Sequence, residues 1–337
     1  MAENQVLTSA GEEKELSELL QIRRDKLSAL VEAGQNPFEL TSYPVDAYAQ
    51  EVKARFTDGE EKTVHIAGRM MSRRIMGKAS FCTVRDFTGT MQYFVQQNEV
   101  GSDAYAAFKT FDLGDIVAAK GVLFRTHAGD LAIRVKEIRL MTKSIRPLPD
   151  KHKGLQDTEL CYRQRYVDLI MNPESRDVFV KRSKIMAAMR EFFNAKGYLE
   201  VETPILQPIP GGASARPFIT HHNSLDVDLY LRIATELYLK KLIVGGFEGV
   251  YEFGKNFRNE GMDRTHNPEF TCMEIYVAYK DYLWMMEFTE QMLEHVALAA
   301  NGTTDLTIDG KAVSFKAPFR RVTMTEAIRE KTGYDIT

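Results

Sequence analysis

The sequence is poor in cysteine, contains no long apolar run and carries almost no net charge. Its three cysteines, Cys82, Cys161 and Cys272, are far apart and follow no metal-binding spacing, which argues against a disulfide framework and favours a reducing compartment. No stretch approaches the roughly 18 consecutive apolar residues of a membrane span. The N-terminus also lacks a basic segment followed by an apolar one. We therefore expect a cytoplasmic chain that does not enter a membrane.

The small net charge hides a strong segregation of charge along the chain. Of 337 residues, 44% are hydrophobic and 27% are charged, a composition typical of folded globular proteins. At about 100–200 residues per domain, this length predicts two domains. The formal net charge is only −3, yet residues 62–146 hold 14 basic and 7 acidic side chains, and residues 1–61 hold 6 and 13. The basic segment indicates that one domain has a polyanionic partner.

The first 146 residues predict a helical extension followed by a small barrel. Apolar residues recur at helical spacing over 14–33, and we assign 1–61 to an N-terminal helical extension. From residue 62 the apolar period changes to two, with a helical insert near 102–110 and glycines, including Gly121, at the expected joints. The predicted strands are 62–71, 79–87, 90–96, 113–125 and 131–140. This pattern predicts an OB-type Greek-key barrel over 62–146.

Such barrels bind single-stranded nucleic acid with a positive groove and stacking aromatic side chains. Phe81 and Tyr93 are candidates for stacking on bases, and Gln92 is a candidate for a hydrogen bond to a base edge. The alternative is that both aromatic residues belong to the strand core and that the basic residues form a solvated face. Composition alone leaves both interpretations open.

Residues 147–154 are rich in charge and proline and predict a linker. Residues 155–337 then alternate long helices, at 174–196 and 281–300, with strands, which predicts an α+β domain. The segment GVYEFGKN at 249–256 is close to a phosphate-binding loop. It ends in Asn and continues as an alternating strand, so we reject that interpretation.

Two alternating stretches, 250–258 and 269–279, predict an antiparallel hairpin with an apolar back and a polar front. Arg258 suits a bidentate clamp on phosphate, because its planar guanidinium stays charged. The front indicates a ligand site, although an ordinary solvated face is the alternative. The front-facing residues are Glu252, Asn256, Arg258, Glu260, Glu274 and Tyr276.

Three further features are ambiguous when each is considered alone. Gly212 lies in a loop of small residues that either admits a ligand close to the backbone or is a plain turn. Glu236 opens a predicted helix and is spaced i,i+4 from Lys240, a pair that at a surface contributes only about 0.3–0.5 kcal/mol. His266 alone is a surface loop histidine.

Taken together, these motifs resemble class II lysine–tRNA ligase (lysyl-tRNA synthetase) of the bacterial type along essentially the whole chain. The first family motif is similar to the long helix with GYLEVETPIL at 197–206, and the second to the strand ending in FRNE at 257–260 with the loop RTHNPEF. RPFITHHN at 216–223 and RIATELYLKKLIVGGF at 232–247 also resemble this family. The resemblance implies an OB barrel followed by an antiparallel class II sheet with flanking helices, the catalytic domain occupying 155–337.

The resemblance also implies roles for individual residues. Arg258 would be the catalytic cation on the α-phosphate of ATP. The other ATP-binding residues would be Glu260, His266, Asn267 and Phe270. Lysine would be bound by Gly212, Glu236, Glu274 and Tyr276, with the two glutamates on its ε-ammonium. The anticodon of tRNA(Lys) would be read by Arg74, Phe81 and Gln92, and a homodimer would form through the first motif.

The resemblance ends before the third family motif, a glycine-rich strand and helix with a further arginine. Nothing after Glu274 resembles that motif or the carboxylates expected for Mg²⁺, and the metal ligands are expected beyond Thr337. We therefore expect the sheet to be incomplete at the C-terminus and this piece alone to be inactive, as a fragment of a longer enzyme. The alternative is a truncated, non-catalytic paralogue that binds tRNA or acts as a regulator.

Overall fold

The computed structural model describes residues 10–59, 61–149 and 154–336, and the chain divides into two compact units, 1–172 and 173–337. Parts of the predicted extension (1–9 and 60) and of the predicted linker (150–153) lie outside the described residues. Across the described ranges, no helix has both the length and the apolar character needed to cross a membrane.

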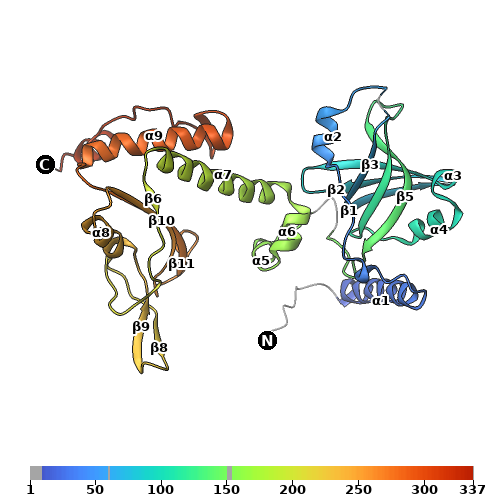
Figure 1. The fold of residues 1–337 in the computed structure, drawn as a ribbon, viewed down its shortest axis with the longest axis horizontal. Helices are drawn as coiled ribbons and strands as arrows, with labels where there is room; N and C mark the ends of the chain where they lie inside the picture. Colours follow the sequence, from blue (N-terminus) through green and yellow to red (C-terminus); the bar gives the residue numbers. More distant parts are fainter. Residues whose placement is uncertain (1–9, 60, 150–153, 337) are drawn as a thin grey trace. The chain divides into compact units, whose positions relative to one another are not determined.

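The first unit is built around a closed five-stranded barrel with the order β1-β2-β3-β5-β4 (Figure 1). All neighbours are antiparallel except β3 and β5, which pair in parallel. The predicted OB-type barrel is therefore confirmed. Its strands are β1 (Thr63–Met76), β2 (Ala79–Arg85), β3 (Thr90–Gln96), β4 (Ile116–Arg125) and β5 (Leu131–Thr142).

Helices surround the barrel, and the residues of two of them belong to its core. Buried residues of α2 and α4, Val52 and Phe108 among them, pack into the same apolar cluster as the inward-facing strand residues. The helices of this unit are α1 (Ala10–Glu32), η1 (Pro37–Glu39), α2 (Ala49–Arg55), α3 (Gln97–Val100), α4 (Ser102–Thr110), α5 (Thr158–Arg163) and α6 (Arg165–Met171). The predicted insert near 102–110 is α4.

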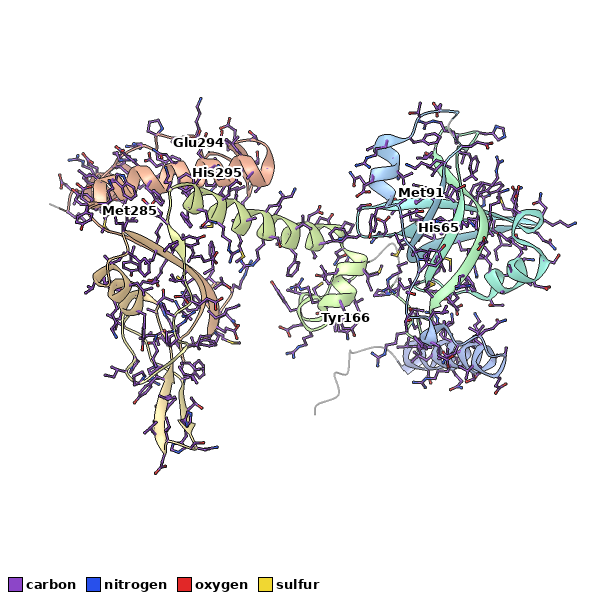
Figure 2. All side chains as sticks on the ribbon, in the orientation of Figure 1. His65, Met91, Tyr166, Met285, Glu294 and His295 are labelled. Carbon is purple, nitrogen blue, oxygen red and sulfur yellow. The ribbon has the colours of Figure 1, made fainter. Side chains whose placement is uncertain are left out.

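The barrel interior decides which strand residues are available to a ligand. Met91, labelled in Figure 2, lies inside the barrel. Tyr93 is also buried, and its hydroxyl donates a hydrogen bond to the Ile66 carbonyl at 3.1 Å. Of the two interpretations left open for Tyr93, the strand-core one is confirmed and stacking on a base is excluded, because β3 alternates and places odd-numbered residues inward. Phe81 instead lies on the half-buried outer face of β2.

Two local predictions about the barrel also needed correction. β1 continues to Met76, beyond the predicted end at residue 71, because a bulge between Met70 and Ser72 lets it keep pairing with β2. Gly121 lies inside β4 and is not a joint. A Cβ there would come within 2.3 Å of the Arg134 carbonyl oxygen, so the close approach of β5 requires glycine.

The second unit contains a three-stranded sheet with the order β11-β10-β6. β10 and β11 form the predicted antiparallel hairpin, whereas the short edge strand β6 runs parallel to β10. The strands are β6 (Leu199–Glu200), β7 (Leu206–Gln207), β8 (Ile219–His222), β9 (Val227–Leu231), β10 (Gly249–Phe257), β11 (Glu269–Val277), β12 (Asp305–Ile308) and β13 (Lys311–Ser314). Strands β7, β9 and β8 form a second sheet, and β12 pairs with β13.

One face of the β10–β11 hairpin is covered by helices α7 and α9, which lie side by side (Figure 1). The ring of Phe193 in α7 stacks on that of Phe288 in α9, with 5.9 Å between the ring centroids. The centroid of the Phe193 ring lies 4.8 Å from that of Tyr251 in β10. Met285 of α9 packs against this cluster (Figure 2). The predicted apolar back is confirmed, so the opposite face is free for a site. The helices are α7 (Pro173–Ala195), α8 (Glu236–Val244), α9 (Tyr282–Asn301) and α10 (Met324–Thr332).

Candidate functional site

The polar front of the hairpin gathers residues from two strands. In the register of β10 and β11, Glu252 lies opposite Glu274, and Asn256 lies opposite Phe270. Arg258 follows directly after β10, and its amide donates to the Pro268 carbonyl at 2.8 Å. The hairpin therefore holds a cation, carboxylates and an aromatic ring on one surface.

Two glutamates and a phenol, Glu236, Glu274 and Tyr276, gather where α8 meets β11, and we call this cluster the acidic pocket. The Tyr276 hydroxyl donates to Glu274 Oε2 at 3.1 Å. Glu236 is the first residue of α8, and its charge reaches the same phenol. The pKa of Tyr276 is raised well above its ordinary value, chiefly because the phenol is buried. The negative charge of Glu274 and its hydrogen bond to Tyr276 raise the pKa further, and the charge of Glu236 adds a smaller effect.

Gly212 completes this pocket from the loop of small residues. Its φ of +87° is a left-handed conformation that favours glycine, and a Cβ there would lie 3.1 Å from the Cβ atoms of both Ala234 and Glu236. The structure thus brings together the four residues that the resemblance links to lysine: Gly212, Glu236, Glu274 and Tyr276.

Arg258 is placed to receive an anion. Its guanidinium carbon lies 5.1 Å from the centroid of the Phe270 ring. Counting only the described residues, its buried Nε has no hydrogen-bond partner, and the same is true of the buried oxygens Thr235 Oγ1 and Asn256 Oδ1. Buried polar atoms are normally satisfied, so the unsatisfied atoms of Asn256 and Arg258, at the end of β10, are consistent with a ligand site there. Sequence reasoning did not identify Thr235, although its position before a helix is a usual capping signal.

A cavity of about 520 Å³ lies at the end of β10, lined by Ser214, Ala215, Arg216, Asn259 and Glu260. Two backbone-linked contacts hold its walls together. The Asn259 amide donates to the Arg216 carbonyl at 2.8 Å, and the Arg216 amide donates to Glu260 Oε1 at 3.2 Å. Glu260, predicted to face the adenine end of ATP, therefore lines an open space beside Arg258.

The other predicted ATP ligands lie on the exposed loop between the two strands. The Asp263 carboxylate accepts hydrogen bonds from the amides of Thr265 and His266 and contacts His266 Nδ1 at 2.8 Å. These hydrogen bonds hold the pKa of Asp263 well below its ordinary value. Asn267 Nδ2 donates to the Glu269 carbonyl at 2.5 Å. In this conformation the side chains of His266 and Asn267 are bonded to their own loop.

A buried network that sequence reasoning missed supports the front of β10. Arg232 Nη1 donates to Glu252 Oε1 at 2.6 Å, and Thr203 Oγ1 donates to Glu252 Oε2 at 2.6 Å. Arg232 Nε donates to the Lys255 carbonyl at 2.9 Å. The predicted front-facing Glu252 is therefore a structural partner of Arg232 and is not open to a ligand. An arginine between apolar residues in the segment 229–233 was the available signal.

The outer face of the barrel carries a row of aromatic rings. The rings of Phe81 and Phe94 are stacked with their centroids 4.6 Å apart, and the centroids of Phe94 and Phe124 are 5.8 Å apart. The Arg134 guanidinium lies 4.9 Å from the centroid of Phe124. Gln92 is two residues before Phe94 on the same face, and Arg74 pairs with Phe81 across the strands. The predicted Arg74, Phe81 and Gln92 therefore share one surface.

Charge on this surface is available to an anion. Lys120, Lys136 and Arg125 are each paired with a carboxylate. Among the residues that the structure describes, no carboxylate lies within ion-pair distance of Arg74 or Arg134, and both are exposed. Stacking rings between unpaired cations are the elements with which such barrels bind single strands. Phe94, Phe124 and Arg134 were not predicted.

The first unit is thus a five-stranded barrel with exposed arginines and aromatic rings, and the second carries an arginine with an unsatisfied nitrogen near two glutamates. Comparison with known families agrees. Residues 64–141 match the family described as "OB-fold nucleic acid binding domain", and residues 157–336 match "tRNA synthetases class II (D, K and N)". The chain belongs to the class II tRNA synthetase family.

The similar curated proteins are lysine–tRNA ligases. The chain is 57% identical to the one from Christiangramia forsetii, over 96% of this chain and 59% of that protein. It is 53% identical to the one from Porphyromonas gingivalis over 96% and 59%, and 50% identical to the one from Clostridium tetani over 96% and 65%. The chain therefore spans about three fifths of the length of these relatives.

Proposed function

We propose that this chain is the anticodon-binding domain and part of the catalytic domain of a lysine–tRNA ligase, which activates lysine with ATP and transfers it to tRNA(Lys). The observation that carries the proposal is the meeting of two glutamates around the Tyr276 hydroxyl beside the unsatisfied Arg258. The alternative of a non-catalytic paralogue has no observation in its favour.

In the first step, the lysine carboxylate attacks the α-phosphate of ATP, and pyrophosphate leaves as lysyl-adenylate forms. Arg258 stabilises the charge that develops on the phosphate, with Phe270 stacked on the adenine and Glu260 at the adenine end. In the second step, a ribose hydroxyl at the 3′ end of tRNA attacks the carbonyl carbon, and AMP leaves. No protein nucleophile takes part, so positioning and charge stabilisation supply the catalysis.

Selection of lysine follows from the acidic pocket. Lysine carries two ammonium groups, and Glu236 and Glu274 are the carboxylates placed to receive positive charge. A neutral analogue would leave a partly buried carboxylate without a partner. Such an unpaired group discriminates between substrates more strongly than a difference in apolar contact does. Aspartate would instead bring a third negative charge into the pocket.

Bound to the phosphates of ATP, Mg²⁺ would neutralise part of their negative charge. Within the described ranges, no group of three His, Cys, Asp or Glu side chains could hold a metal ion, so the residues present provide no complete metal site.

On the barrel, Phe81 stacks on an anticodon base, Gln92 reads a base edge and Arg74 neutralises a phosphate. Phe94 supports the Phe81 ring and is itself in contact with Phe124. We also propose a homodimer that forms through α7 and the strand after it, in the cytoplasm. Apolar side chains that are open to solvent on this segment support that interface: Val178 is 63% exposed, Ile185 37% and Leu199 48%.

The experiment that tests the function is aminoacylation of tRNA(Lys) with radiolabelled lysine by the full-length gene product. We expect lysine to be attached, and a protein that binds tRNA(Lys) without charging it would contradict the proposal.

A further inference from the structure

The acidic pocket already holds an ammonium group, and it belongs to this chain. Lys240 Nζ lies 2.5 Å from Glu236 Oε1 and 5.9 Å from the centroid of the Tyr276 ring. Tyr276 in turn donates its hydroxyl hydrogen bond to Glu274. A lysine side chain of the protein therefore contacts the carboxylate and the aromatic ring that the proposed function assigns to substrate lysine.

An ordinary surface ion pair explains only part of this arrangement. Lys240 and Glu236 are spaced i,i+4 on α8, a pair that contributes little in water. Lys240, however, also lies over the Tyr276 ring, whose hydroxyl is bonded to the second carboxylate, Glu274. The negative charges of Glu274 and Glu236 both raise the pKa of Tyr276, and the Lys240 ammonium group is a cation placed between these groups.

The neighbouring lysine shows that this placement is specific. Lys241, on the same turn of α8, lies 4.6 Å from the centroid of the Tyr238 ring, and no carboxylate is within ion-pair distance of it among the described residues. The Lys240 side chain is 56% exposed, so it is free to leave the pocket without disturbing the core. The Lys240 ammonium group can therefore be replaced at Glu236 by the ammonium group of a ligand.

We propose that Lys240 is a resident counter-ion of the amino-acid pocket, which an ammonium group of substrate lysine displaces from Glu236. The proposal rests on the proposed function, in which this pocket binds lysine. Lys240 thereby stabilises the empty pocket and sets the affinity for lysine, because the observed affinity is the intrinsic affinity multiplied by the fraction of molecules in which Glu236 is free. A ligand without an ammonium group cannot make this exchange.

The test is calorimetric titration of L-lysine into the full-length gene product and three variants. Lys240→Met and Lys240→Gln remove the competing charge and should bind lysine about two- to ten-fold more tightly, as expected if Glu236 is free in roughly a half to a tenth of wild-type molecules. Lys241→Met makes the same change of net charge one residue away and should leave the affinity unchanged. Equal or weaker binding by both Lys240 variants would overturn the proposal.

A second measurement keeps the wild-type sequence and does not depend on how the variants fold. After ¹³C-methylation of lysine side chains, the NMR signal of Lys240 should move toward that of a free, solvated lysine as L-lysine saturates the protein. A signal that stays in place at saturation would show that Lys240 is not displaced. If the wild-type protein neither binds lysine nor shows lysine-dependent pyrophosphate exchange, the proposed function itself fails, which is a separate outcome.

Discussion

Arg232 and Glu252 form an ion pair of 2.6 Å with side chains that are only 3% and 2% exposed, beneath the polar front of β10. Arg232 also bonds to the carbonyls of Thr203 and Lys255, so one guanidinium joins the loop after β6 to β10. A buried ion pair does not by itself show that the protein gains stability from it. Removing one partner, however, lowers the free energy of unfolding, because the other charge stays buried and unpaired. The pair ties down β10, the strand that directly precedes Arg258.

Gly254→Ala tests this network. A Cβ at Gly254 would lie 2.1 Å from Arg232 Nη2, and the guanidinium is held by its hydrogen bonds on several sides. We expect the free energy of unfolding to fall by about 2–4 kcal/mol, measured by urea denaturation. Gly261→Ala is the control, because nothing lies within 4 Å of a Cβ there. Equal stability of the two variants would mean that Arg232 moves aside easily.

Arg258→Ala should lower the rate of lysine-dependent ATP–pyrophosphate exchange by at least about 100-fold, because a preorganised cation is lost from the phosphate. Lys255→Ala, which removes an exposed lysine paired with Glu269, should leave exchange unchanged. Both variants should unfold cooperatively in thermal denaturation. Exchange that survives in Arg258→Ala would refute the assigned role.

Phe94→Ala should impair tRNA recognition about as much as Phe81→Ala, although of these two residues only Phe81 was named in the sequence analysis. Phe94 supports Phe81 at 4.6 Å, and base–aromatic stacking contributes about 1–3 kcal/mol per base. Gln92→Ala should act in the same direction. All three variants should raise the KM for tRNA(Lys) and leave pyrophosphate exchange unchanged. Loss of both activities together would contradict the assignment of tRNA recognition to the barrel and of adenylate formation to the second unit.

Cys82 should be the last of the three cysteines to react with a thiol reagent. It lies in the barrel core, and burial raises the pKa of its thiol to about 12. At pH 8 its thiolate fraction is roughly 10⁻⁴, against roughly a quarter for an unperturbed thiol. Mass spectrometry after timed labelling should find Cys82 modified only on unfolding, and rapid labelling of the native protein would show that the barrel opens readily.

The same pKa has a consequence for stability. The folded Cys82 thiol keeps its proton to about pH 12, whereas the unfolded thiol loses it near pH 8.5. Above pH 8.5 the folded state therefore binds more protons than the unfolded state. The contribution of Cys82 is complete below that pH and is lost as pH rises toward 12, so Cys82→Ala should reduce the alkaline loss of stability.

Much of this architecture could be predicted because the spacing of apolar residues along the chain indicates helices and strands directly. The alternation over 250–258 and 269–279 predicted β10, β11 and their apolar back, and period-two segments predicted the barrel. The side on which Tyr93 faces depends on strand register, which propensity does not reveal.

The parts that could not be predicted depend on contacts between distant residues. The Arg232–Glu252 pair and the stacking of Phe81, Phe94 and Phe124 join residues from different strands. Glu236 and Lys240 illustrate the same limit. Their spacing predicted the ion pair correctly, but only the fold shows that Tyr276 and Gly212 lie beside it.

The most direct test of the account is ATP–pyrophosphate exchange by the full-length gene product with lysine, aspartate and asparagine compared at equal concentration. The acidic pocket predicts rapid exchange with lysine and background exchange with the other two amino acids. Exchange driven by aspartate or asparagine, or none with lysine, would contradict the assignment of Glu236, Glu274 and Tyr276 to a cationic substrate.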